Sequence, residues 1–163
     1  MSRLITRDQW AAYMNIGSHS APIWAPMAEG FTRFSESVNP MEYSYQHFDR
    51  PEEYTDVIGF SPAYSYTVDA IADDPIVAEL IHITDSKLTG ADARREILLV
   101  NRWQSIAPGI FRAFLRTVSV IPATSGQEVG IMVYSGTMKC AGRAIPGAFD
   151  VGQHEFFTEV ETQ

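Results

Sequence analysis

Runs of alternating residues, separated by turn-forming residues, restrict this chain to a fold rich in β-strands. The clearest run covers residues 63–70, where larger apolar side chains take every second position. A period of two places successive side chains on opposite faces of an extended chain. The sequence predicts further strands at 27–37, 42–48, 54–60, 95–103, 111–121, 129–140 and 154–160, with turns between them, one of which is at Ser125-Gly126.

One segment has the helical period instead. Ile76, Leu80 and Ile83 recur at helical spacing, and Asp74-Pro75 precedes them. An acidic side chain at the cap accepts hydrogen bonds from unpaired backbone N–H groups, and proline fits the first helical position. We therefore predict a helix that begins at Pro75, runs to about residue 84 and has Asp74 as its N-cap.

The N-terminal segment carries a weaker helical signal. Thr6 and Gln9 have the spacing of a capping box, in which a hydroxyl and an amide satisfy backbone groups reciprocally. This spacing predicts a short helix or helical turn that leads into Trp10–Met14. Residues 15–26, with a glycine and two prolines, are predicted to be irregular.

About seven short strands with one central helix predict a mostly β domain, a sandwich or barrel with the helix packed against it. No internal repeat or linker divides the chain, so residues 1–163 are predicted to form one domain. A chain of this length buries roughly 70% of its unfolded surface and needs no disulfide or metal. The single cysteine, Cys140, excludes an internal disulfide and is predicted to be a small buried thiol.

The charge of the chain narrows its functional class. Twenty acidic residues against 12 basic ones give a formal net charge of −8. Proteins that grip nucleic acid gather Lys and Arg, so this balance argues against such a binder but not against a protein that DNA passes without being held. No signal sequence and no apolar run long enough to cross a bilayer is present, which predicts a soluble protein made in the cytoplasm and not bound to a membrane.

A long aromatic hairpin or arm is predicted between residues 39 and 58. Tyr43, Tyr45 and His47 share one face of an extended segment, and a polar stretch with a proline precedes the returning strand. Exposed aromatic side chains and unpaired strand edges promote association. The pattern alone leaves two interpretations equal: the arm serves association, or it folds back on its own sheet.

Motifs for catalysis or metal binding are missing from the sequence. The four histidines stand at least 28 residues apart, without the close spacing of a zinc site, and no Gly-x-Ser-x-Gly or phosphate-binding glycine motif occurs. The adjacent carboxylates of Asp73 and Asp74 are better explained by the helix cap than by acid–base chemistry. We therefore predict no cofactor, no metal and no catalytic residues.

Basic residues gather in two neighbouring strands. In an acidic chain we interpret them as partners of carboxylates, within the subunit or across an interface, rather than as a nucleic-acid site. These interface candidates are Arg94, Arg95, Arg102, Arg112 and Arg116.

The order of these elements resembles that of a known family. The segments Glu29–Pro40, Tyr54–Tyr66 and Asp74–Ile76, with the later 96–100 and 130–137 strands, are similar to the tail tube (major tail) proteins of tailed bacteriophages and phage-derived particles, especially those of Gram-positive hosts. The resemblance covers about residues 24–149. Residues 1–23 and 151–163 match nothing in particular and are expected to be peripheral.

The resemblance implies a β-sandwich flanked by a helix, with six subunits in a ring and rings stacked into a tube. The tube conducts genomic DNA without binding it specifically, and the protein is assembled in the bacterial cytoplasm and belongs to the virion tail. Tail terminator, tape-measure and baseplate proteins would be its partners. Its arm would reach a neighbouring subunit or ring through Asn39, Glu42, Tyr43, Tyr45, Phe48, Glu52 and Tyr54.

An acidic lumen is the further expectation, because carboxylates repel phosphates and keep DNA moving. The predicted lumen residues are Glu29, Glu36 and Glu128. One alternative is the tube of a contractile tail or of a DNA-free bacteriocin particle. Another, from a different class, is a small β-barrel enzyme or ligand-binding protein that uses His47, Asp56 or His154 in a pocket.

Overall fold

A computed structural model describes residues 3–128 and 130–158. Within them lie eleven strands, one α-helix and two 3-10 helices. In chain order these are η1 (Arg7–Gln9), β1 (Trp10–Asn15), β2 (Trp24–Pro26), β3 (Phe31–Ser37), β4 (Pro40–Tyr45), β5 (Tyr54–Phe60), β6 (Ala63–Asp69), α1 (Pro75–Ser86), η2 (Gly90–Ala93), β7 (Arg94–Ala107), β8 (Ile110–Glu128), β9 (Ile131–Cys140), β10 (Ile145–Asp150) and β11 (Glu155–Thr158).

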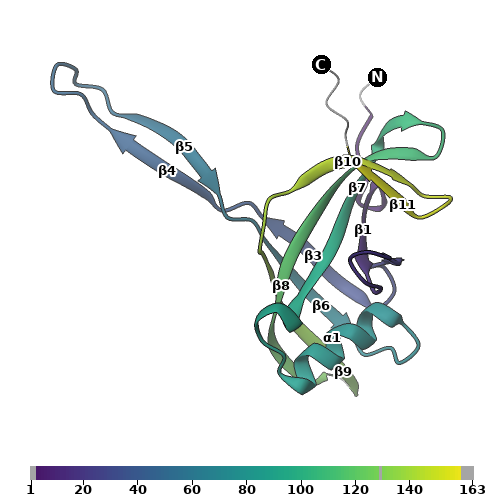
Figure 1. Cartoon of the computed structure of the whole chain (residues 1–163). Coiled ribbons are helices and arrows are strands. Elements are labelled where there is room, and N and C mark those ends of the chain that lie inside the picture. Colours follow the sequence, from purple (N-terminus) through teal and green to yellow (C-terminus); the bar gives the residue numbers. More distant parts are fainter. Residues whose placement is uncertain (1–2, 129, 159–163) are drawn as a thin grey trace.

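Nine of the strands form one antiparallel sheet in the order β2-β1-β7-β8-β9-β6-β3, with β10 paired to both β8 and β11. The remaining pair, β4 and β5, forms a separate two-stranded ribbon that projects from the body (Figure 1). The predicted class, a mostly β protein with one helix packed against the sheet, is confirmed.

The sheet is rolled around its core. Strand β8, 19 residues long, pairs with β7 and β10 in its first part and with β9 in its second. Trp10 of β1 and Phe34 of β3 stack with ring centroids 5.5 Å apart, although four strands (β7, β8, β9 and β6) separate β1 from β3 in the sheet order. Contact between strands so distant in the sheet requires the sheet to curl into an open barrel.

Helix α1 closes this barrel with its apolar face. Its buried residues Ile76, Val77, Leu80 and Ile83 join the same cluster as the inward-facing side chains of β6, β7, β8 and β9. The N-cap forms as predicted: Asp74 accepts hydrogen bonds from the backbone N–H groups of residues 76 and 77, at 2.9 and 3.2 Å. Pro75 occupies the first turn, where its missing N–H costs no hydrogen bond. The Asp74 carboxylate is therefore explained as the N-cap of α1.

A second apolar cluster covers the other face of the sheet, but only toward one end. Phe149 of β10 is fully buried and packs on Tyr13 of β1, with ring centroids 4.6 Å apart. Trp24 of β2 and Leu98 of β7 complete this cluster. The sheet is therefore covered on both faces near β10 and β11, whereas toward α1 the core lies on one face.

Of the short helix or helical turn predicted before residues 10–14, the helical turn is confirmed, and a helix continuing through these residues is not formed. The capping box forms, with the Thr6 N–H donating to the Gln9 side chain at 2.9 Å, and η1 follows it. The chain then enters β1, paired with β2 and β7. Met14 is fully buried on one face and Tyr13 is buried on the other, so two-sided burial outweighs the local helical signal.

Other strand predictions differ in extent or were missed. Strand β2 lies in the segment predicted to be irregular, β10 was not predicted, and β8 runs through the turn expected at Ser125-Gly126. The turn lies instead near Gly130, whose φ of +82° suits glycine. Residues 129, 159 and 160, parts of two predicted strands, lie outside the described residues, as do the ends of the segments expected to be peripheral.

The single α-helix in the described part of the chain lacks the length and apolarity needed to cross a bilayer.

Candidate functional site

The ribbon of β4 and β5, which we call the arm, exposes several large apolar side chains to solvent. It continues the β3–β6 pair away from the body (Figure 1). At its base Asn39 donates from Nδ2 to the Ser61 carbonyl at 3.1 Å, and Ser61 returns a backbone hydrogen bond at 3.0 Å. Asn39 adopts φ +48°, a conformation that asparagine tolerates better than most residues. This clamp turns the chain out of the main sheet and into the arm.

An aromatic ladder occupies one face of the arm: Tyr43, Tyr45, His47 and Tyr54. Ring centroids lie 5.7 Å apart between Tyr43 and Tyr45, 5.8 Å between Tyr45 and Tyr54, and 5.2 Å between Tyr45 and His47. Cross-strand pairing of Tyr45 with Tyr54 places these rings directly opposite each other. The neighbouring Asp56 carboxylate raises the pKa of the Tyr45 hydroxyl. The ladder thus presents a continuous row of stacked and edge-on rings on one face of the arm.

The other face and the tip of the arm carry most of its polar side chains. Ser44 and Thr55 hydrogen-bond across the strands at 3.0 Å, on the face opposite the ladder. At the tip, Gln46 donates to the Pro51 carbonyl at 2.9 Å and fixes the turn. Residues 39–58 carry five carboxylates and one basic residue, Arg50, so the arm has a formal charge of −4.

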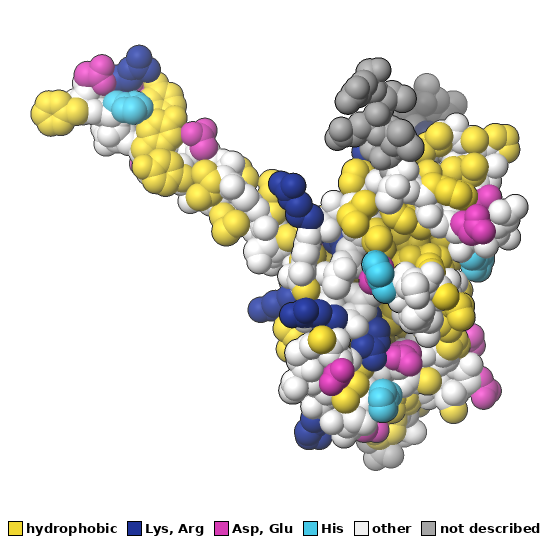
Figure 2. Space-filling model, viewed as in Figure 1, with side chains coloured by type: hydrophobic (Ala, Val, Ile, Leu, Met, Phe, Trp, Pro, Cys, Tyr) yellow, Lys and Arg dark blue, Asp and Glu magenta, His cyan; other side chains and the backbone are white. Residues whose placement is uncertain are grey.

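Large apolar side chains on the arm are open to solvent. Tyr43 is 56% exposed, Ile58 is 66% exposed, and Phe48 at the tip is fully exposed. Hydrophobic side chains run along the arm, while acidic, basic and histidine side chains gather at its tip (Figure 2). Exposed aromatic surface held on a rigid ribbon is the chemistry of an interaction site, with the rings as anchors.

The arm residues singled out in the sequence occupy different parts of this structure. Asn39 forms the base; Tyr43, Tyr45 and Tyr54 form the ladder; Phe48 and Glu52 lie in the turn at the tip; and Glu42 lies on the face opposite the ladder, paired with Val57. The predicted arm, residues 39–58, includes Met41, Val57 and Ile58, but sequence reasoning did not single out these residues, or Phe60 beyond them, as exposed apolar surface.

The five arginines expected at an interface have separate environments. Arg95 donates from Nε and Nη2 to Glu79 of α1 at 3.2 and 3.1 Å, an ion pair within the subunit. Arg102 lies over the ring of Phe111, and Arg112 over that of Phe114. Arg116 donates to the sulfur of Cys140 at 3.5 Å, and Arg94 is exposed beside Arg95. Cys140 itself is only partly buried.

The predicted lumen acids are not brought together. Glu29 lies in the turn that precedes β3, whereas Glu36 pairs with Tyr64 and so points toward the core side of the sheet. The side chain of Glu128 lies outside the described residues. A shared acidic surface of these three residues stays a prediction.

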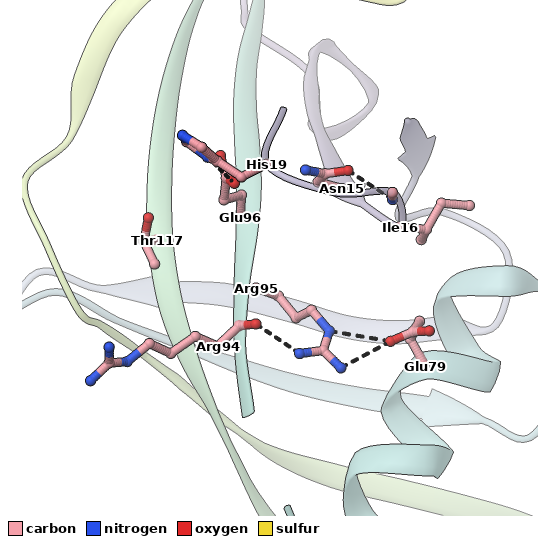
Figure 3. A pocket seen from close by; sticks show the side chains of 9 residues that line it. Asn15, Ile16, His19, Glu79, Arg94, Arg95, Glu96 and Thr117 are labelled. Atoms are coloured by element: carbon pink, nitrogen blue, oxygen red, sulfur yellow. Dashed lines mark hydrogen bonds and ion pairs between the residues drawn. The ribbon is translucent and has the colours of Figure 1, made fainter. Parts of the chain in front are cut away.

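A polar pocket of about 450 Å³ lies between β7, α1 and the loop after β1 (Figure 3). His19 Nδ1 and Glu96 Oε1 are 2.7 Å apart in it, and Arg95 pairs with Glu79 nearby. These two pairs link the loop after β1 and helix α1 to β7, while Arg94, which also lines the pocket, forms no ion pair with a described residue. Hydrogen bonding to Glu96, followed by the charge of that carboxylate, raises the pKa of His19.

The Glu96→Gln variant is expected to lower the pKa of His19 toward 6.5, its ordinary value. Because the folded-state pKa is raised, the stabilisation from this contact is complete below pH 6.5 and is lost as the pH rises through the raised pKa. An NMR titration of the His19 ring measures the shift. Glu79→Gln, in the same pocket, is the control and leaves it unchanged; an equal pKa in the wild type and Glu96→Gln would contradict the assignment.

The residues of the enzyme alternative do not converge. His47 and Asp56 lie on the arm, while His154 lies beyond β10 and packs edge-on against Tyr13, with ring centroids 5.8 Å apart. Among the described residues no group of three or more His, Cys, Asp or Glu could hold a metal ion. The arm is thus the strongest candidate for a functional surface.

Comparison with solved structures places this fold. One chain in a cryo-EM structure of the anti-feeding prophage (AFP) baseplate, 6-fold symmetrised, matches with a TM-score of 0.52 and 7% identity over 93% of this chain and 99% of that one. A chain in the virion of the native gene transfer agent (GTA) particle matches with a TM-score of 0.50 and 14% identity, over 86% of this chain and 97% of that one. These chains share the fold. No family model and no curated protein matches the sequence.

Proposed function

We propose that this chain is a structural subunit of a phage-type tail tube, in which hexameric rings stack around a lumen that conducts DNA. The role is structural, so no catalytic group is needed. Tail terminator, tape-measure and baseplate proteins are the further partners of such a tube, and the virion tail is its location.

The uncovered aromatic arm is the observation that carries this proposal. The stacked tyrosines lie on a projecting ribbon whose strands pair only with each other, and the described body of the subunit does not cover them. A second copy supplies one, because a contact between two different surfaces repeats from copy to copy and either closes a ring or continues as a stack. The shared fold with chains from a 6-fold baseplate and a virion supports the same assembly class.

The sheet edge supports ring formation as well. Strand β3 lies at the end of the sheet, where its outer side has no strand partner in the part of the chain that the structure describes. An open edge invites pairing with another chain, and closure of strands around an axis removes the free edge. Ring formation thus satisfies the β3 edge, and the arm is left to join neighbours or rings.

The tube of a contractile tail or of a DNA-free bacteriocin particle would use the same subunit contacts. Such particles differ from the proposed tube in a surrounding sheath or in the cargo of the lumen, and both lie outside this chain.

Negative-stain microscopy of the purified protein tests the proposal. Tubes or six-fold rings are the expected result, with sedimentation showing species of six or more copies. A protein that stays monomeric at all concentrations would overturn the assembly role and return the enzyme or ligand-binding alternative to first place.

A further inference from the structure

One face of the β3-β6-β9-β8 part of the sheet stands out from the rest of this acidic chain. The alternate side chains Tyr64, Tyr66 and Val68 of β6 are fully buried in the same core as α1. Since successive side chains of a strand point to opposite faces, the residues between them point away from α1. The second apolar cluster, built from β1, β2, β7, β8 and β10, does not extend over this part of the sheet.

Hydroxyl groups predominate on this face in rows that cross the strands, and the exposed apolar side chains of Ile121, opposite Thr137, and of Ile131 lie on the same side. The first row is Ser35, Ser65 and Thr137, and the second is Thr67, Ser135 and Thr124, each residue directly opposite the next in the strand register. The hydroxyls of Thr124 and Ser135 are in direct contact. We call the surface made by these six residues the hydroxyl face. Its residues are exposed or half-buried.

The described charged side chains beside the hydroxyl face are mostly basic. The register places Arg33 beside Thr67, Lys139 opposite Ala63, and Asp69 opposite Val133, all on the same side. Among the described side chains on this side, two cations stand against one carboxylate, whereas the chain as a whole carries a charge of −8. The register also places Glu128 opposite Ile131 at the end of β8, and its side chain lies outside the described residues. Neither Arg33 nor Lys139 forms an ion pair with any residue that the structure describes.

This chemistry suits a polyanion in motion better than a docked protein. Protein interfaces depend on large buried anchors such as Trp, Tyr and Arg, whereas serine and threonine offer little area. Hydroxyl groups hydrogen-bond phosphate oxygens without reading sequence, and water replaces those bonds at little cost. Two separated cations give a weak, salt-screened attraction rather than the dense cluster that holds DNA in place.

We propose that the hydroxyl face lines the lumen of the tube and that duplex DNA passes over it. This inference rests on the proposed function, since it requires a tube. It differs from the predicted acidic lumen at two of the three residues, because Glu36 lies on the other face of β3 and Glu29 lies in the turn before it. The side chain of the third, Glu128, lies outside the described residues. The wall then releases DNA through short exchangeable contacts rather than through repulsion.

Cysteine labelling of assembled tubes tests which face is inside. In a Cys140→Ser background, Ser65→Cys marks the hydroxyl face, and Ser86→Cys, at the exposed end of α1, marks the other side of the subunit by the same substitution. Tubes are treated with N-ethylmaleimide or with a maleimide on a polymer too wide for the lumen. We expect the polymer to label Ser65→Cys at least tenfold more slowly than Ser86→Cys, while N-ethylmaleimide labels both.

Any other labelling result would overturn either the lumen assignment of the hydroxyl face or the proposed function. Equal labelling of Ser65→Cys and Ser86→Cys by the polymer would put the hydroxyl face on the outside, and no labelling of Ser65→Cys by either reagent would put it between subunits. Glu36→Cys, one residue from Ser35 but on the other face of β3, compares the acidic lumen directly. Absence of tubes in the Cys140→Ser parent and the wild type would instead contradict the proposed function.

A second readout concerns DNA itself. Tubes of Ser65→Lys/Ser135→Lys, assembled with a short DNA duplex, are expected to retain several-fold more nuclease-protected duplex than wild-type tubes at low salt, and to lose it as salt rises. Ser86→Lys tubes are the control, and any duplex they bind stays sensitive to nuclease. No gain of protected duplex in Ser65→Lys/Ser135→Lys tubes would overturn the DNA-facing assignment.

Discussion

Tubes are expected to be lost when the aromatic ladder is removed, in the variant Tyr43→Ser/Tyr45→Ser/Tyr54→Ser. An anchor residue at a protein interface contributes about 2 kcal/mol, roughly 30-fold in affinity. Such losses are not additive, so removal of three neighbouring anchors is expected to weaken each subunit contact by at least about a hundredfold. The arm contributes nothing to the two apolar clusters, so the subunit still folds. Negative-stain microscopy and sedimentation measure the loss of tubes, and thermal unfolding confirms the fold.

The matched control alters the polar face of the same ribbon. Ser44→Ala/Thr55→Ala removes one exposed hydrogen bond and leaves the ladder in place, so tubes should form normally. Deletion of residues 41–57 should repeat the effect of the triple variant. Tubes of normal length and stability from the deletion variant would show that the arm is not an assembly element.

Leu80→Ala is expected to lower the free energy of unfolding by about 3 kcal/mol, because truncation of a buried leucine loses its transfer free energy and leaves a cavity. Leu80 is fully buried where α1 meets the sheet. For a chain of this size the change lowers Tm by about 10 °C. Differential scanning calorimetry and urea unfolding measure the two quantities.

His82→Ala on the exposed side of α1 is the control. It replaces a solvent-facing side chain with a better helix former, so the free energy of unfolding should change by no more than about 0.5 kcal/mol. If Leu80→Ala were no more destabilised than His82→Ala, that result would contradict the burial of Leu80 between α1 and the sheet.

Sequence patterns correctly predicted the elements that are stabilised mainly by interactions between residues close in the sequence. The Asp74-Pro75 cap and the 76, 80, 83 spacing placed α1 because a cap hydrogen bond and a helical face involve neighbouring residues. Alternation placed β6 because one face of that strand is buried and the other is not. The arm was placed by a proline-bounded pair of aromatic runs, and its strands lie at Pro40–Tyr45 and Tyr54–Phe60.

Elements decided by distant contacts were misjudged. Residues 10–14 carry a capping box before them, yet they become β1 because β7, nearly a hundred residues later, pairs with them and both faces are buried. Strand β8 runs through Ser125-Gly126 because β9 continues the ladder beside it. A short sequence window does not include the distant strand that pairs with it, so local patterns cannot predict this pairing.

The candidate functional surfaces were likewise predictable from sequence only in part. The sequence alone determined an acidic, mostly β chain with one capped helix, an aromatic arm, and no motif for catalysis. Only the tertiary structure decided that the arm stands free, that Glu36 faces away from Ser35 and Ser65, and that serines and threonines from separate strands share one face. The physical reason is register: which side chains share a surface depends on how distant strands pair, and a shift of one residue would move every side chain to the other face.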